Sequence, residues 1–181
     1  MNETNENVKF RRANIEDVHQ LVTVNLETWK STYGNFMSTE LLERRTKDRL
    51  VMERNYLELI KKYNQIYVVE VGGVVIGYIS YGPSEMEGYE MYGEVYTFYI
   101  LEEYQGRGYG SKMLRMAFDD LRNQGYKDVV ITCLWDNIDG VNFYKKHGGE
   151  VVGHPIYNVY EQQFKDTIIV YDEEDLNVKT L

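Results

Sequence analysis

The sequence has few residues that could form disulfide bonds or bind a metal. It has one cysteine, Cys133, and two prolines among 181 residues. A single cysteine cannot form an internal disulfide, and Cys133 lies within the apolar run VVITCLW, which predicts a buried strand residue in a reducing, cytoplasmic compartment. The three histidines, His19, His147 and His154, share no metal-ligand spacing with carboxylates or the thiol, so we expect no metal.

Long hydrophobic runs and excess positive charge are also missing. No apolar run approaches membrane-spanning length and the first residues, MNETNENVKF, are polar, so we expect no membrane partner and no targeting segment. The net charge of −9 disfavours nucleic acid as a partner and favours cations. There is no repeat and no Pro/Gly/Ser-rich linker, and the length suits one domain over 1–181 with a core of about 8–171.

What is present alternates between strand and helix patterns. Apolar or β-branched runs predict strands over about 8–12, 65–71, 74–82, 95–100, 128–135, 150–155 and 166–172. Periodic apolar residues predict helices from Asn14, an N-cap with Asp17 at its third position, over about 38–63 in one or two pieces, from the glycines to Gly125, and over 138–147. The first helix is expected to face the core with Val18, Val22, Leu26 and Trp29. This alternation predicts a mixed α/β sheet.

The stretch TFYILEEYQGRGYGSKMLRMAF, from Thr97 to Phe118, places three alternating glycines between a strand and a helix. Alone, the glycines could form an ordinary turn. At the start of a helix, however, backbone N–H groups and the helix dipole favour an anion such as phosphate, and Arg107, Lys112 and Arg115 add positive charge. Two better-known phosphate loops fit badly: the nucleotide-triphosphate loop needs Gly-Lys-Ser/Thr, whereas Ser111-Lys112 follows Gly110, and the dinucleotide fingerprint needs a glycine where Ser111 stands.

The pattern that does fit is Gln/Arg-x-x-Gly-x-Gly, and here the sequence resembles the GNAT superfamily of N-acetyltransferases. The six residues of the match are Gln105-Gly106-Arg107-Gly108-Tyr109-Gly110. Asn137 and Tyr144, seven apart, match the family's asparagine and tyrosine on a later helix, and ETWKSTYGNFMSTELLE is similar to its first-helix turn. The resemblance covers about Val8 to Tyr171. It implies a twisted, mostly antiparallel sheet of about seven strands, flanked by about four helices, with a splayed central strand pair.

The resemblance also implies acetyl-CoA as co-substrate. The glycine segment would close on the pyrophosphate, and the end of the preceding strand would pair with the pantetheine arm. Asn137 would hold the cofactor or cap its helix. The residues expected to bind the cofactor are Phe98, Tyr99, Ile100, Gln105, Gly106, Arg107, Gly108, Tyr109, Gly110, Ser111 and Asn137.

For the chemistry, the resemblance implies Glu94 as general base and Tyr144 as proton donor to the leaving thiolate. The alternatives are a solvated strand-end glutamate and a tyrosine that only packs on the sheet. Some branches of the family carry a glutamate five positions before the asparagine, where this chain has Thr132. A backbone N–H near Tyr99 would meet the oxyanion. Gly140 and Gly149 depart from the residues common in the family and put local packing in question.

On the acceptor side, Trp29, Tyr33 and Phe36 match the turn that lines the acceptor pocket in relatives, although ordinary packing explains them as well. The acidic segment with Glu85, Glu87 and Glu90 would attract a cationic acceptor or simply be a solvated loop. The expected function is N-acetylation of a small amine or polyamine by direct attack in a ternary complex. A peptide or protein acceptor, an acyl-CoA sensor without turnover and a nucleotide-binding regulator are the alternatives, and the resemblance is compatible with a homodimer.

Overall fold

The computed structural model describes residues 7–34, 37–159 and 162–172, and the chain divides into two compact units. The first unit comprises Met1–Ser80 and Thr97–Leu114, and the second comprises Tyr81–Tyr96 and Arg115–Leu181. Two strands and one helix begin in one unit and end in the other. The single domain expected from length remains a prediction.

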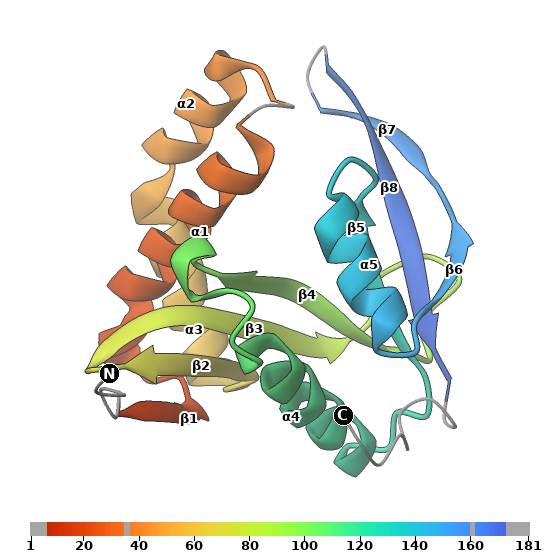
Figure 1. The fold of residues 1–181 in the computed structure, drawn as a ribbon, viewed down its shortest axis with the longest axis horizontal. Coiled ribbons are helices and arrows are strands. Elements are labelled where there is room, and N and C mark those ends of the chain that lie inside the picture. The colour runs from red at the N-terminus through yellow and green to blue at the C-terminus, as the bar shows by residue number, and fades with distance from the viewer. Residues whose placement is uncertain (1–6, 35–36, 160–161, 173–181) are drawn as a thin grey trace, which may run out of the picture. The chain divides into compact units, whose positions relative to one another are not determined.

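The described residues form eight strands, five α-helices and two 3-10 helices. In chain order these are β1 (Val8–Arg12), η1 (Ile15–Asp17), α1 (Val18–Tyr33), α2 (Thr39–Lys47), α3 (Arg49–Lys62), β2 (Ile66–Val71), β3 (Val74–Pro83), β4 (Gly93–Ile100), η2 (Glu102–Tyr104), α4 (Tyr109–Asn123), β5 (Val129–Leu134), α5 (Ile138–Lys146), β6 (Glu150–Gly153), β7 (Ile156–Val159) and β8 (Gln162–Tyr171). Figure 1 shows these elements along the chain. The predicted mixed α/β fold with a mostly antiparallel sheet is confirmed, with one strand and one helix more than expected.

In the first unit, β1 pairs antiparallel with β2 and β2 with β3, and α1 packs against α3 (Figure 1). The predicted start of the first helix is confirmed: Asn14 and Asp17 form a capping box, in which Asn14 accepts from the Glu16 N–H and Asp17 from the Asn14 N–H, each at 2.8 Å. The first turn is 3-10, and α1 proper begins at Val18.

Helix α1 faces the core with predicted apolar residues and also with polar ones. Val22 is fully buried, and the partly buried Val18 and Leu26 pack against the core. Trp29 is partly buried, whereas the polar residues Asn25 and Thr28, which were not predicted to face the core, are buried. The apolar pattern of the helix could not predict the burial of Asn25, because its hydrogen-bond partners lie far along the chain.

The partners of Asn25 are two core tyrosines. Its Nδ2 donates to the hydroxyls of Tyr56, at 3.0 Å, and Tyr78, at 2.8 Å, and these hydroxyls also bond to each other. Tyr78 is completely buried, and burial, followed by the neighbouring Tyr56 and Tyr99, raises its pKa well above the ordinary value. The first unit therefore has a hydrogen-bonded polar group within its apolar core.

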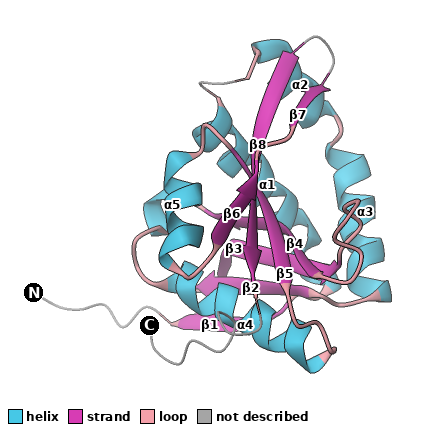
Figure 2. Cartoon of the chain, turned by 90° about the vertical axis from the view of Figure 1, so that its right-hand side faces the viewer, coloured by secondary structure: helices cyan, strands magenta, loops and turns pink. Residues whose placement is uncertain are grey.

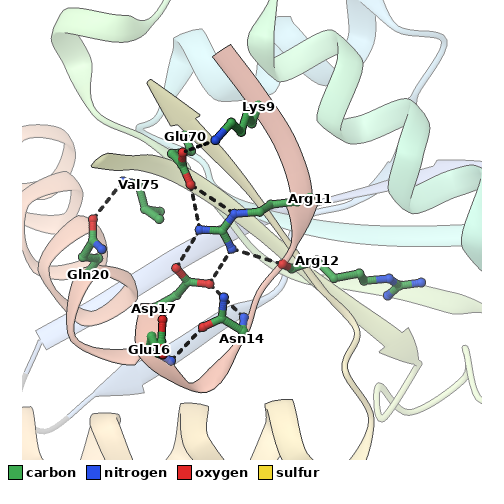
Figure 3. Close-up of polar contacts among 9 residues, drawn as sticks. All are labelled: Lys9, Arg11, Arg12, Asn14, Glu16, Asp17, Gln20, Glu70 and Val75. Carbon is green, nitrogen blue, oxygen red and sulfur yellow. Dashed lines mark hydrogen bonds and ion pairs between the residues drawn. The ribbon is translucent and has the colours of Figure 1, made fainter. Parts of the chain in front are cut away.

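An ion network ties β1 to β2 and to the start of α1 (Figure 3). The Arg11 guanidinium donates to both oxygens of Asp17, at 2.7 and 2.9 Å, and to Glu70, at 2.9 and 3.1 Å. Lys9 adds a second cation 3.4 Å from Glu70. Both carboxylates are buried, so the bidentate arginine offsets the cost of removing them from water.

In the second unit, β5 pairs in parallel with β4 on one side and antiparallel with β8 on the other, and β6 and β7 both pair with β8 (Figure 2). The parallel ladder covers only Gly93–Val95 and Val129–Ile131. Strand β7 was not predicted, because Pro155 and exposed side chains obscure its pattern.

Register assigns the side chains of the second unit's sheet to two faces, because paired residues share a face and neighbours alternate. Gly93 lies against Leu121 of α4, so the adjacent Glu94 belongs to the opposite face. The pairs Glu94↔Val130 and Leu134↔Asp166 belong to this same opposite face, four residues apart along β5.

Both glycines that departed from the family pattern have a packing reason. A Cβ at Gly149 would lie 2.5 Å from Ile169 Cγ2 and 2.9 Å from Tyr171 Cζ, so β8 and the chain after α5 approach too closely for any side chain. The Tyr171 hydroxyl donates to the Tyr144 carbonyl at 2.9 Å and thereby anchors α5. A Cβ at Gly140 would lie 2.6 Å from the Asn137 side chain, which caps α5.

Candidate active site

The glycine segment has the backbone conformation that its sequence demands. Gly106 and Gly108 have φ of +72° and +81°, a region that side chains rarely adopt, and a Cβ at either would meet nothing within 4 Å. Conformation rather than space therefore requires these two glycines. Gln105 fastens the segment to β4, because its Nε2 donates to the Ile100 carbonyl at 2.8 Å.

Helix α4 begins immediately after these glycines. Its first turn includes Gly110 and Ser111, and the Lys112 N–H closes back on the Gly108 carbonyl at 3.3 Å. N–H groups in the first turn of a helix lack intrahelical acceptors and lie at the positive end of the dipole. Such a terminus, reached through a glycine-rich turn, can hold a phosphate group.

Two basic side chains of the first unit lie beside this helix start. Arg107 is exposed, donates to the Glu103 carbonyl at 3.0 Å and lies over the Tyr104 ring. Lys112 Nζ lies 4.0 Å from the centre of the Phe10 ring, and Tyr109 packs edge-on against the same ring. These contacts hold both cations near the glycine segment, where they favour an anionic ligand.

The structure brings one predicted acceptor residue, Trp29, to a predicted cofactor residue, Tyr99. Trp29 Nε1 donates to the Tyr99 hydroxyl at 2.8 Å, and Trp29 packs edge-on against the buried Tyr33. Tyr99 shares β4 with Phe98 and Ile100. The sequence did not point to the neighbouring Thr28, whose buried hydroxyl finds no hydrogen-bond partner within the described ranges. Phe36 lies outside the described residues.

Glu94 is held by its own loop. One carboxylate oxygen, Oε2, accepts from the Ser84 hydroxyl at 2.8 Å and from the Glu85 N–H at 3.2 Å. The other oxygen makes no hydrogen bond to any residue that the structure describes. Glu94 is thus partly exposed, oriented by two neutral donors, and able to accept a proton.

Asn137 and Tyr144 both belong to α5 and its cap. Asn137 Oδ1 accepts from the Gly140 N–H at 3.0 Å, so the capping role expected as one alternative is present. The thiol of Cys133 is buried as predicted, and burial, followed by the charge of Asp166, raises its pKa to about 12. Tyr144 is buried in the last turn of α5, two residues before its end.

A carboxylate that the sequence analysis missed lies on β8. Asp166 is half-buried, and among the described residues its side chain accepts one hydrogen bond, from the Tyr157 hydroxyl at 3.2 Å. Burial raises the pKa of Asp166 above its ordinary value, more than that hydrogen bond lowers it. Burial, followed by the charge of Asp166, likewise raises the pKa of Tyr157 to about 12. Little in the sequence singled out Asp166, because a single aspartate at the start of an apolar run is common.

Among the described residues, no group of three or more histidine, cysteine or acidic side chains could hold a metal ion. In the same part of the chain, every helix is too short or too polar to cross a membrane.

Comparison with known sequences points to one family. The model of the acetyltransferase (GNAT) family matches residues 26–149. An uncharacterized N-acetyltransferase of Bacillus subtilis, YuaI, is 27% identical over 167 residues, which cover 88% of this chain and 90% of the relative. The spermidine N(1)-acetyltransferase of Thermoplasma acidophilum is 24% identical over 148 residues, covering 80% and 89%.

Solved structures share the fold. The PaiA N-acetyltransferase of Thermoplasma acidophilum, solved with coenzyme A, aligns with a TM-score of 0.69 at 21% identity, covering 91% of this chain and 98% of the other. The yncA protein of Salmonella typhimurium, solved with acetyl-CoA, also has a TM-score of 0.69, at 20% identity and with 92% and 94% coverage. Since the family model spans more than half of the sequence, the chain belongs to the acetyltransferase (GNAT) family and is an acyltransferase.

Proposed function

We propose that the protein transfers the acetyl group of acetyl-CoA to a primary amine of a small molecule, by direct attack in a ternary complex. The observation that carries this proposal is the glycine segment at the start of α4, with left-handed backbone at Gly106 and Gly108. Two of the solved relatives are named as complexes with coenzyme A or acetyl-CoA, and the spermidine acetyltransferase supports an amine acceptor.

In this proposal, the first unit binds the co-substrate. Backbone N–H groups from Gln105 to Ser111 would receive the pyrophosphate, and Arg107 would add charge. The β4 residues from Phe98 to Ile100 would pair with the pantetheine arm. The absence of contacts for a Cβ at Gly106 and Gly108 fits a backbone that a bulky anion approaches closely. Acetyl-CoA would supply an activated acyl thioester. The protein's own groups would bind the substrates, remove the proton from the amine and donate a proton to the thiolate.

Removing a proton from the amine is a larger chemical demand than protonating the departing thiolate. An amine with a pKa near 10.4 is neutral in roughly one part in a few thousand at pH 7. A general base contributes about 10²–10⁴-fold, which matches that deficit. Glu94 would take this proton, directly or through water, with Ser84 and the Glu85 N–H orienting its carboxylate.

Two further groups would act at the thioester. Tyr144 would donate a proton to the departing thiolate, and its helix is anchored for this by the Tyr171 hydrogen bond and the Asn137 cap. A backbone N–H near Tyr99 would donate to the oxyanion that forms as the amine attacks. Trp29, which is hydrogen-bonded to Tyr99, and Tyr33, which packs against Trp29, would contact the acceptor.

Two measurements, made one after the other, test this function. A ligand at 100 times its dissociation constant stabilises a protein by about 2.7 kcal/mol, so acetyl-CoA and CoA should raise the melting temperature while ATP and NAD should not. Release of free thiol from acetyl-CoA is then followed across a panel of small amines. Turnover with at least one amine is expected. No stabilisation by either CoA species, or no thiol release with any amine, would overturn the proposal.

A further inference from the structure

The face of the second unit that carries Glu94 also carries a small site on the β7–β8 pair. Tyr157 pairs with Phe164 across these strands, and their rings stack with centroids 6.0 Å apart. Asp166 follows two positions after Phe164 and therefore shares its face. Phe164 is buried and Tyr157 is 38% exposed, so the pair forms an apolar floor beside a carboxylate.

The Asp166 carboxylate has no cation beside it. None of the lysine, arginine or histidine side chains in the described ranges makes an ion pair with it, and only Oδ1 is hydrogen-bonded. The adjacent Lys165 points to the other face, where its Nζ lies 3.6 Å from the centre of the Trp135 ring. The nearby thiol of Cys133 is neutral because burial raises its pKa. A carboxylate that gives up water without gaining a cation costs free energy unless a ligand supplies the charge.

Register relates Asp166 to the proposed general base. Glu94 lies in the row of Val130, and Asp166 lies in the row of Leu134. The two carboxylates are thus separated by about 13 Å along the strands and by about 10 Å across them. An amine that reacts beside Glu94 could reach Asp166 only with a second cation at the end of a flexible chain.

We propose that Asp166, with Tyr157 and Phe164, binds the distal ammonium group of a linear diamine or polyamine acceptor, and so selects acceptors with two or more cations. The inference rests on the proposed acetylation. Asp166 donates no proton and forms no bond to the reacting atoms; it accepts hydrogen bonds from the far ammonium, while the stacked rings contact the methylene chain. Its loss should therefore weaken substrate binding and leave the chemical step intact.

A matched pair of substrates tests this selection. The amines 1,8-diaminooctane and n-octylamine have the same chain length and differ only in the distal ammonium. Hydrogen bonds to a charged group correspond to about 10- to 100-fold in binding, so Asp166→Asn should raise KM for the diamine by that factor, with kcat nearly unchanged. KM for n-octylamine should change less than about twofold. Asp166→Glu should keep part of the preference, and Tyr157→Phe should lose only a few-fold.

The control is Glu150→Gln, which removes an exposed carboxylate from β6 of the same unit and should leave both substrates unaffected. An equal rise in KM for both amines in Asp166→Asn, or no preference for the diamine in the wild-type enzyme, would overturn the inference. Calorimetric titration with 1,8-diaminooctane tests the site independently of turnover. If no amine is acetylated but the diamine binds wild type and not Asp166→Asn, the site stands and only the proposed function fails.

Discussion

Asp17 and Asp166 show two ways of taking an aspartate out of water. Burial alone would raise the pKa of Asp17, but the hydrogen bonds from Arg11 and from the Asn14 N–H outweigh it, and the pKa is lowered (Figure 3). For Asp166 the same burial meets only a tyrosine hydroxyl, and the pKa is raised. The first carboxylate has its cation built into the fold, and the second does not.

This difference separates structural from functional charges in the chain. Asp17 contributes to stability because its removal would take two carboxylate acceptors from Arg11, which would keep Glu70, and would leave the Asn14 N–H without its acceptor. Within the part of the chain that the structure describes, the Asp166 side chain makes one hydrogen bond and no ion pair. We therefore expect substitutions at Asp17 to affect folding and substitutions at Asp166 to affect substrate binding.

The largest expected effect is the loss of the shared cation. Arg11→Met leaves Asp17 and Glu70 buried, with only Lys9 near Glu70, and should lower the free energy of unfolding by about 3 kcal/mol. Urea denaturation measures this, with Arg54→Gln as a control at an exposed position of α3. A change no larger than that of the control would mean that the network is not stabilising.

Glu94 provides a third case, a carboxylate held only by neutral donors. Glu94→Gln keeps the shape and can still accept from Ser84, so folding should be nearly unchanged while kcat at pH 7 falls about 100-fold. The loss should shrink as the pH approaches the pKa of the amine, because the substrate then deprotonates by itself. The matched control is Glu87→Gln in the same loop. Unchanged rates from pH 6 to 8 would remove Glu94 from the mechanism.

Asp17→Asn should cost about 2 kcal/mol at pH 7, since charged hydrogen bonds to Arg11 are replaced by neutral ones. The pKa of Asp17 is lowered in the folded state, so its contribution is present above the ordinary value of 3.8 and is lost as pH falls through the folded-state pKa. The difference in stability between wild type and variant should therefore close in strong acid. A difference that persists unchanged from pH 7 to pH 2 would show that charge is not its cause.

Tyr144→Phe removes a hydroxyl and keeps the ring that is buried on α5. We expect kcat to fall about 10-fold because proton donation to the leaving thiolate is lost, and the melting temperature to change little because the buried ring is kept. Tyr126→Phe, a partly buried tyrosine with no proposed role, serves as the control. Full activity in Tyr144→Phe would refute the donor role.

The smallest expected effect is the change in the free energy of unfolding caused by Asp166→Asn. Its sign is opposite to that of the other stability changes. The pKa of Asp166 is raised in the folded state, so its favourable contribution exists only at low pH and is lost as pH rises from 3.8 through the folded-state pKa. Replacing it with the neutral amide should leave stability at pH 7 unchanged or raise it by less than about 1 kcal/mol. A loss of about 2 kcal/mol, as for Asp17, would make Asp166 a structural residue.

Sequence predicted the local features of this molecule well. The capping box at Asn14, the apolar face of α4 and the glycine segment are all encoded within a few residues, and each is present. Family resemblance added the fold, which the comparisons confirm. The roles of Glu94 and Tyr144 remain predictions.

What sequence could not predict depends on distant pairing. Arg11 meets Glu70 across 59 positions, and Asn25 meets Tyr78 across 53. The burial of Asn25 on α1 was therefore not predicted. Asp166 meets Tyr157 through β7, a strand whose exposed residues give no periodic signal. In each case the partner becomes visible only when the tertiary structure is known.

The most direct test of the contrast between the two aspartates is a carboxyl titration by NMR, with and without 1,8-diaminooctane. We predict that Asp17 titrates below 3.8 and is unmoved by the diamine, whereas Asp166 titrates above 3.8 and shifts downward when the ammonium binds. An Asp166 carboxyl that titrates at or below 3.8, or a diamine that shifts both residues equally, would contradict the account.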